Sequence, residues 1–178
     1  MSIKDIIAQA FGLIGFFLMV YSYQEKDNKK FVMLQGVAGF AFFMNFILIG
    51  AISAALFNIV NFVRGFIFSK NDKKLFKLLS AIALYLVCFV ISLPAVVGNP
   101  LQLFLSTLTF FAILTMTFFM WKGNGKHIRY AQLAFGSPAW LIYDIFNFSL
   151  GGIMTEVLSM ASVVIALIRY GKNGFEEN

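Results

Sequence analysis

The chain has 178 residues, of which 60% are hydrophobic and only 12% are charged, and its mean hydropathy is +0.84. A soluble domain of this length carries roughly 25% charged residues, so the composition argues against a soluble enzyme or nucleic-acid-binding domain. It predicts a polytopic membrane protein. The net charge of +6 must then be explained by where the basic residues lie. Cys88 is the only cysteine, so no intrachain disulfide forms.

Seven apolar segments are each close to the ~20 residues that an α-helix needs to cross ~30 Å of hydrocarbon. They run from Ile6 to Tyr23, Phe31 to Ile49, Ala51 to Phe68, Leu75 to Val97, Pro100 to Trp121, Ile128 to Phe148, and Gly151 to Tyr170. We expect the first segment to be retained, because it extends beyond the apolar core of a signal peptide. The sequence therefore predicts an all-α membrane protein with seven transmembrane helices.

The short connections between these segments alternate strictly between basic and non-basic. The basic ones carry Lys26, Lys29 and Lys30; Lys70, Lys73, Lys74 and Lys77; Lys122, Lys126 and Arg129; and Arg169 and Lys172. The non-basic ones are Gly50-Ala51, Val97-Gly98-Asn99 and Ser149-Leu150-Gly151. The positive-inside rule then predicts an N-terminus outside and a cytoplasmic C-terminus. Four aromatic residues flank the basic loops as an interfacial belt would: Tyr23, Trp121, Tyr130 and Tyr170.

The hydropathy pattern repeats at an offset of 98 residues without gaps. Two three-helix units can lie parallel in a membrane only if an extra helix joins them, and the fourth segment supplies that helix. The sequence therefore predicts 3+1+3 parallel repeats around a cavity near the midplane. The expected units are a first repeat at 1–70, a linker helix at 71–98, a second repeat at 99–172 and a tail at 173–178.

Polar residues within the apolar segments mark the candidate site. The spacing of Asn58, Asn61 and Arg64 places all three on one helical face. An Arg at the centre of a membrane helix costs roughly 2.5–3.5 kcal/mol, so this face must look at protein or water. At the repeat offset, Asn58 aligns with Glu156, Asn45 with Tyr143 and Phe42 with Trp140. The predicted substrate-binding residues are Asn45, Asn58, Asn61, Arg64, Trp140, Tyr143, Asp144 and Glu156, with Gln35, Gln102, Thr107 and Thr115 as further candidates.

These residues support two readings. In one, Arg64 and the carboxylates of Glu156 and Asp144 line a pathway for a small polar solute, anionic or zwitterionic, and one carboxylate carries protons. In the other, Arg64 and Glu156 are a structural ion pair, and the Asn residues hold helices together.

The layout resembles the SWEET and SemiSWEET sugar transporters. Their sixth helix carries a W-x-x-Y segment followed by a pocket-lining Asn, and here Trp140-Leu141-Ile142-Tyr143 is followed by Glu156. More specifically, the chain is similar to the YgjV family of bacterial inner-membrane proteins. That resemblance rests on three stretches: Asn61-Phe62-Val63-Arg64, Ser149-Leu150-Gly151-Gly152-Ile153-Met154-Thr155-Glu156, and Ile168-Arg169. It implies a SWEET-like, multi-pass protein of the bacterial inner membrane.

The chain departs from the SWEET pattern at two kinds of position. Tyr23-Gln24 and Trp121-Lys122 stand where those transporters have a Pro-Gln hinge, and Glu156 replaces the second-repeat Asn. Pro138 in the sixth segment is expected to provide one kink instead.

We therefore expect a SWEET-like permease for a small polar solute. The alternative is a non-transporting receptor, sensor or structural protein on the same scaffold. The sequence carries no metal-ligand cluster, nucleophile motif or phosphate-binding loop, so we expect no enzyme activity, no metal and no cofactor. The expected partners are the lipid bilayer and the solute, and no nucleic acid. The sequence leaves the oligomeric state open.

Overall fold

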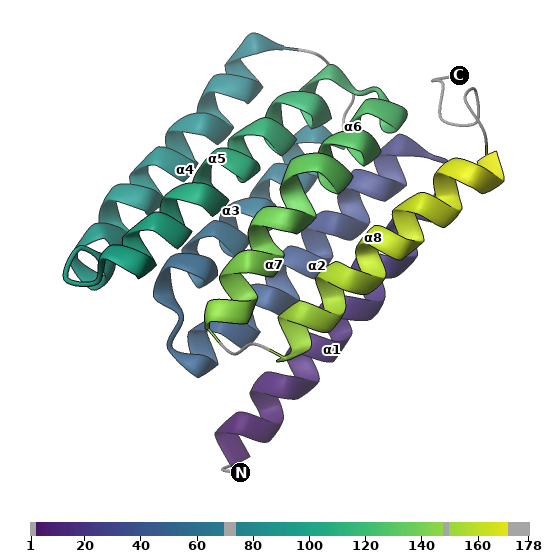
Figure 1. Ribbon diagram of the computed structural model, residues 1–178. Coiled ribbons are helices and arrows are strands. Elements are labelled where there is room, and N and C mark those ends of the chain that lie inside the picture. The colour runs from purple at the N-terminus through teal and green to yellow at the C-terminus, as the bar shows by residue number, and fades with distance from the viewer. Residues whose placement is uncertain (1–2, 70–73, 148–149, 171–178) are drawn as a thin grey trace.

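The computed structural model describes residues 3–69, 74–147 and 150–170 (Figure 1). These residues form helices and no strand, which confirms the predicted all-α class. The elements are α1 (Ile3–Ser22), α2 (Asn28–Ile49), α3 (Ile52–Phe68), α4 (Leu75–Val96), α5 (Pro100–Lys122), α6 (Gly125–Ala131), the π-helix η1 (Gln132–Gly136), α7 (Ser137–Phe146) and α8 (Leu150–Tyr170). Each predicted apolar segment coincides with helix to within a few residues. The predicted tail at 173–178 and the loop residues Lys70, Lys73, Ser149 and Lys172 lie outside the described residues.

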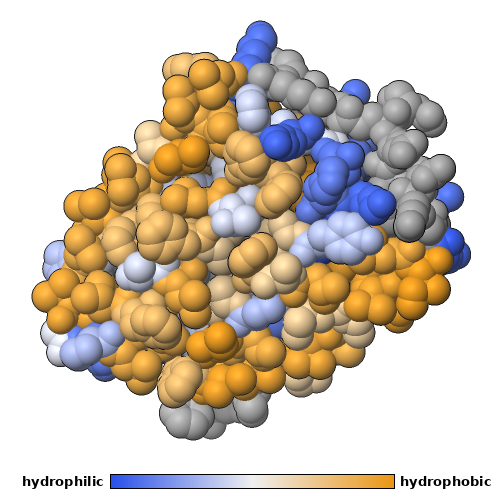
Figure 2. All heavy atoms as spheres, turned by 45° about the horizontal axis from the view of Figure 1, so that its top comes forward, coloured by the Kyte–Doolittle hydropathy of each residue, from blue (hydrophilic) through white to orange (hydrophobic). Residues whose placement is uncertain are grey.

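The helices are suited to a bilayer. Among the described residues, α1, α2, α4, α5 and most of α8 are long and apolar enough to cross a membrane, and α3 is a shorter apolar helix. Large apolar side chains also cover the outside, with Phe17, Phe76 and Ile168 at least 66% exposed. The face in Figure 2 is mostly hydrophobic, and the strongly hydrophilic residues gather toward its upper right. A soluble monomer does not expose so much apolar surface, so this surface faces lipid.

Short capped connections set the antiparallel order of neighbouring helices. The Asp27 carboxylate caps α2 by accepting hydrogen bonds from the backbone N–H groups of Lys29 and Lys30. Asn99 caps α5 in the same way, directly before Pro100. Gly50 and Gly123 end α2 and α5 with φ of 83° and 74°, a conformation that favours glycine.

The helices pack as a closed ring with one helix outside it. Around the ring α1 packs on α2, α2 on α3, α3 on α5, α5 on the α6–η1–α7 segment, α7 on α8, and α8 on α1. Helix α4 packs against α3 and α5 from outside, at the edge of the bundle in Figure 1. The two termini of the chain therefore come from adjacent helices, α1 and α8.

Glycines bring α2 and α3 into direct backbone contact. A Cβ atom added at Gly65 of α3 would lie 2.5 Å from the Cα atom of Gly36, and one at Gly39 of α2 would lie 3.0 Å from the Asn58 carbonyl oxygen. In a membrane the hydrophobic effect does not drive helices together, so close van der Waals packing through small residues carries the association. This contact presents the polar face of α3 to the inside of the ring.

We predict that Gly65→Ala lowers the free energy of unfolding by about 1–3 kcal/mol, because the added methyl group overpacks the α2–α3 contact. Thermal unfolding of the purified variant in detergent measures the loss. Gly98→Ala is the matched control, because nothing lies within 4 Å of a Cβ atom at Gly98. Equal losses in the two variants would contradict the close-contact explanation.

The sixth apolar segment is not one regular helix, as the kink predicted at Pro138 suggested. The backbone widens into the π-helix Gln132–Gly136, and the N–H of Ser137 donates to the Gln132 carbonyl oxygen, five residues earlier. Proline has no N–H and its ring crowds the carbonyl four residues back, so an irregular turn before Pro138 relieves that conflict. Such π-helical turns occur often at functional sites.

Arg129, which the sequence places among the basic residues of the connection after the fifth segment, is not exposed there. Its side chain is fully buried in the last turn of α6 and donates hydrogen bonds to the backbone oxygens of Tyr23, Glu25 and Gly125. Its guanidinium also lies 4.7 Å from the ring centroid of Phe31. Tyr23, expected in the interfacial belt, is buried beside it. A buried guanidinium replaces lost water with these acceptors, so Arg129 joins α6 to the carbonyl end of α1.

We predict that Arg129→Gln lowers the free energy of unfolding by about 1–3 kcal/mol, because carbonyl groups at the end of α1 lose their donor. Lys29→Gln removes an exposed cation from the same end of the bundle and serves as the control. Thermal unfolding in detergent compares the two. A loss confined to Lys29→Gln would be evidence against this role for Arg129.

Candidate functional site

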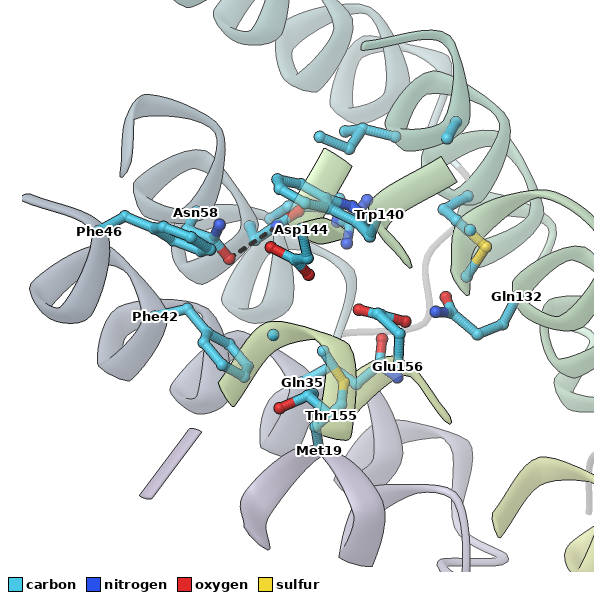
Figure 3. Close-up of a pocket in the computed structure, with 17 residues that line it drawn as sticks. Met19, Gln35, Phe42, Phe46, Asn58, Gln132, Trp140, Asp144, Thr155 and Glu156 are labelled. Carbon is cyan, nitrogen blue, oxygen red and sulfur yellow. Dashed lines mark hydrogen bonds between the residues drawn. The ribbon is translucent and has the colours of Figure 1, made fainter. Parts of the chain in front are cut away.

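A cavity lies inside the ring, and every ring segment contributes to its wall (Figure 3). It offers about 60 Å³ of space to the centre of a water-sized sphere, while a single water needs about 10–15 Å³ of such space. The lining residues are Met19; Gln35, Phe42 and Phe46; Asn58, Asn61 and Arg64; Ala112, Ile113 and Met116; Gln132 and Gly136; Trp140 and Asp144; and Gly152, Thr155 and Glu156. The cavity is therefore of a size for a few waters or a small solute.

The structure brings together most of the residues predicted for the site. Those that line the cavity are Asn58, Asn61, Arg64, Trp140, Asp144 and Glu156. The other two do not line it. Asn45 is buried and donates to the Ala8 carbonyl oxygen at 2.7 Å, while the Tyr143 hydroxyl lies 3.2 Å from Ser53 Oγ. Asn45 thus joins α2 to its neighbour α1, whereas Tyr143 joins α7 to α3, which are not neighbours in the ring.

Arg64 is held in the wall by contacts with α4 and α5. It is only 6% exposed, its Nη1 donates to Thr117 Oγ1 at 2.8 Å, and its guanidinium carbon lies 5.7 Å from the ring centroid of Tyr85. The Nε group has no hydrogen-bond partner among the described residues. A buried charge with an unused donor is costly, so Arg64 is the least satisfied of the polar groups on the α3 side of the cavity.

A chain of hydrogen bonds fixes the rest of the α3 face. The Tyr85 hydroxyl donates to Asn61 Oδ1 at 2.6 Å, Asn61 Nδ2 donates to Asn58 Oδ1 at 3.3 Å, and Asn58 Nδ2 donates to the Ala54 carbonyl at 2.9 Å. The chain runs from α4 to the cavity. Although α4 lies outside the ring, it thus orients two of the amides in the wall.

Glu156 stands on the α8 side of the cavity. It is 8% exposed, its carboxylate hydrogen-bonds to Ser137, and Ser137 Oγ accepts from Gln132 Nε2 at 2.9 Å. Its Oε2 atom has no hydrogen-bond partner among the described residues. Figure 3 shows the Gln132 amide pointing toward Glu156. Because Gln132 and Gly136 bound the π-helix, that irregular turn supplies the groups that hold this carboxylate.

The position of the Asp144 side chain explains why residue 152, the second of two consecutive glycines, is glycine. The Asp144 side chain is 2% exposed, and a Cβ atom at Gly152 would overlap its carboxylate. Only glycine therefore lets the start of α8 approach this group. Figure 3 shows the carboxylates of Asp144 and Glu156 directed into the same space.

The interpretation of Arg64 and Glu156 as a structural ion pair does not hold. Arg64 donates to Thr117, Glu156 bonds to Ser137, and no ion pair joins Arg64 to Glu156 in the described part of the chain. The two charges stand in separate parts of the cavity wall.

Sequence reasoning selected some polar residues that the fold uses differently. Gln35 lines the cavity. Gln102 instead donates to Asn147, while the hydroxyls of Thr107 and Thr115 donate to backbone carbonyls of their own helix. Gln132 also lines the cavity, but it was not selected from the sequence. The available signal was its position shortly before Gly136-Ser137-Pro138, where the helix was expected to kink.

These features define the class: a polytopic membrane protein with a polar cavity inside a ring of helices. A family model described as "Imp-YgjV: Bacterial inner membrane protein" matches residues 6–174. The chain belongs to this family, and it is a multi-pass protein of the bacterial inner membrane. No curated protein and no solved structure matches it, so the resemblance to SWEET transporters stays a prediction.

We predict that Gly152→Ala lowers the free energy of unfolding by about 1–3 kcal/mol, because the new methyl group must displace the Asp144 carboxylate. A double-mutant cycle tests the cause. In an Asp144→Ala background the same glycine substitution should cost much less, because the overlapping group is gone. Additive losses, measured by thermal unfolding in detergent, would disprove the overlap as the reason.

Proposed function

We propose that this protein is a permease for a small polar solute, which binds in the central cavity. The observation that carries the proposal is the cavity itself, because every ring segment lines it and buried ionisable side chains point into it. Ionisable residues within a membrane protein are expensive and typically mark substrate or ion pathways. A purely structural bundle would gain more from filling this space with apolar side chains.

We also propose that the chain consists of two parallel three-helix repeats joined by α4. Three pairs of cavity-lining residues stand 98 residues apart: Phe42 and Trp140, Phe46 and Asp144, and Asn58 and Glu156. The helix packing supports the same repeat relation. The first helix of each proposed repeat packs against the last helix of the other: α1 against α8, and α5 against α3. The middle segment of each repeat, α2 or α6–η1–α7, packs against the two other helices of its own repeat. In this proposal the polar α3 face and the α8 carboxylate are equivalent parts of the two repeats.

The proposed orientation places the N-terminus outside and the C-terminus in the cytoplasm. It is supported by described basic residues at the end of the bundle where α1, α5 and α8 finish: Lys26 after α1, Lys122 in the last turn of α5 and Arg169 in the last turn of α8. Transport would proceed by rocking one repeat against the other around the cavity. The π-helix before Pro138 is a suitable place for the second repeat to bend. We propose no chemical reaction on the solute.

The proposal predicts that purified protein in proteoliposomes takes up a component of a pooled set of isotopically labelled amines, amino acids, organic acids and sugars. Arg64→Gln or Glu156→Gln should reduce that uptake at least about tenfold, which corresponds to ~1.4 kcal/mol of lost binding. Mass spectrometry of the vesicle contents measures uptake.

Two matched variants are the controls, Arg169→Gln and Glu25→Gln, because these residues lie outside the cavity lining. Uptake that is equally sensitive to all four substitutions would argue against the site. Ligand binding without any uptake would favour a receptor or sensor instead.

A further inference from the structure

The cavity is lined by both cationic and acidic side chains, which come from different helices of its wall. Its described lining contains one cationic side chain, Arg64, and two carboxylates, Asp144 and Glu156. All three are at least 92% buried. Asp144 lies close enough to Glu156 for the two charges to interact, and Arg64 is paired with neither Glu156 nor any other acid in the described contacts.

The carboxylate end of the cavity favours a cation. Two carboxylates that share a poorly hydrated space repel one another unless a proton or another cation joins them. The Glu156 Oε2 atom also lacks a donor among the described residues. An ammonium group supplies both a positive charge and three N–H donors.

Aromatic rings complete this end of the cavity. Phe46 and Trp140 stack with ring centroids 6.2 Å apart and an interplanar angle of 24°, and Phe42 also lines the space. Trp140 lies one helical turn before Asp144, so its indole and the carboxylate share a face of α7. Ring faces attract organic cations, and the described residues contain no group of three or more His, Cys, Asp or Glu side chains that could hold a metal ion.

The Arg64 end favours an anion. Arg64 lies six residues beyond Asn58 on α3, which is about 9 Å along the helix axis. Its unused Nε–H donor lies in the wall there. A carboxylate accepts hydrogen bonds from a guanidinium better than a neutral group does. Because Arg64 and Glu156 have different partners and form no ion pair with each other in the described part of the chain, a zwitterion whose opposite charges are several bonds apart matches the charge pattern better than a single charge does.

We propose that the solute is a small zwitterionic ammonium compound. Its ammonium lies between Asp144 and Glu156 against the Trp140 ring, and its carboxylate meets Arg64. This inference rests on the proposed function, because it names the solute class of the same cavity. A neutral sugar would bring no charge to oppose the Arg64 guanidinium or the Glu156 carboxylate, and a simple anion would face two carboxylates.

A matched four-carbon series tests the charge pattern. The probes are 4-aminobutanoate, butylammonium, butyrate and butanol, each added at equal millimolar concentration to the full-length protein in detergent. A bound ligand raises the melting temperature by mass action. We expect the zwitterion to raise it most, by at least about 2–4 °C, butylammonium to raise it less, and butyrate and butanol not to raise it.

Substitutions test which residues bind the ammonium group and which bind the carboxylate of the solute. Glu156→Gln and Asp144→Asn should each remove the response to butylammonium, while Arg64→Gln should remove only the advantage of 4-aminobutanoate over butylammonium. Glu25→Gln and Asp5→Asn repeat the acidic changes outside the cavity and should respond as the unchanged protein does. If one cavity variant fails to fold, the remaining acidic variant still tests the ammonium end.

The outcomes separate this inference from the proposed function. No rise with either amine, or a larger rise with butyrate, would overturn the zwitterion assignment. Uptake of butyrate into proteoliposomes would support a permease while refuting the assignment. Binding of 4-aminobutanoate without uptake would support the assignment and refute transport.

Discussion

The cost of placing charge in a membrane governs this structure. Hydrocarbon hydrates neither a guanidinium nor a carboxylate, so Arg64, Asp144 and Glu156 are tolerated only where protein surrounds them. All three lie inside the ring of helices, while the outer surface is covered by apolar side chains. The ring separates a lipid-facing exterior from a polar interior.

Supporting contacts keep that interior in place. Thr117 of α5 and Tyr85 of α4 hold Arg64, and the Gln132–Ser137 pair holds Glu156. Gly152 leaves room for the Asp144 carboxylate. The helix that lies outside the ring and the π-helix of the sixth segment are therefore parts of the site, because each fixes a charged side chain from behind. Thr117, Tyr85 and Ser137 do not line the cavity themselves, so substituting one of them would alter the cavity without changing its lining residues.

Several features of the site were predictable because they depend on local patterns. The polar stripe of α3 follows from helical periodicity, which puts Asn58, Asn61 and Arg64 on one face. The offset of 98 residues brought Asn58 into register with Glu156. The same offset also matched Asn45 with Tyr143, yet neither side chain lines the cavity, because Asn45 bonds to α1 and Tyr143 contacts Ser53 of α3. Helical periodicity shows which residues share one face of a helix. The rotation of that helix about its own axis in the bundle decides which of those residues reach the cavity.

The sequence by itself determined the all-helical class, the apolar segments and the family, because hydropathy and helix length follow from local composition. Only the tertiary structure decided that Arg129 is buried against the carbonyls of α1, since loop position alone suggests a solvated side chain. It also decided that Arg64 and Glu156 stand apart, and that Gln132 supports the carboxylate through Ser137. Those outcomes depend on contacts between residues distant in the chain, which no local pattern records.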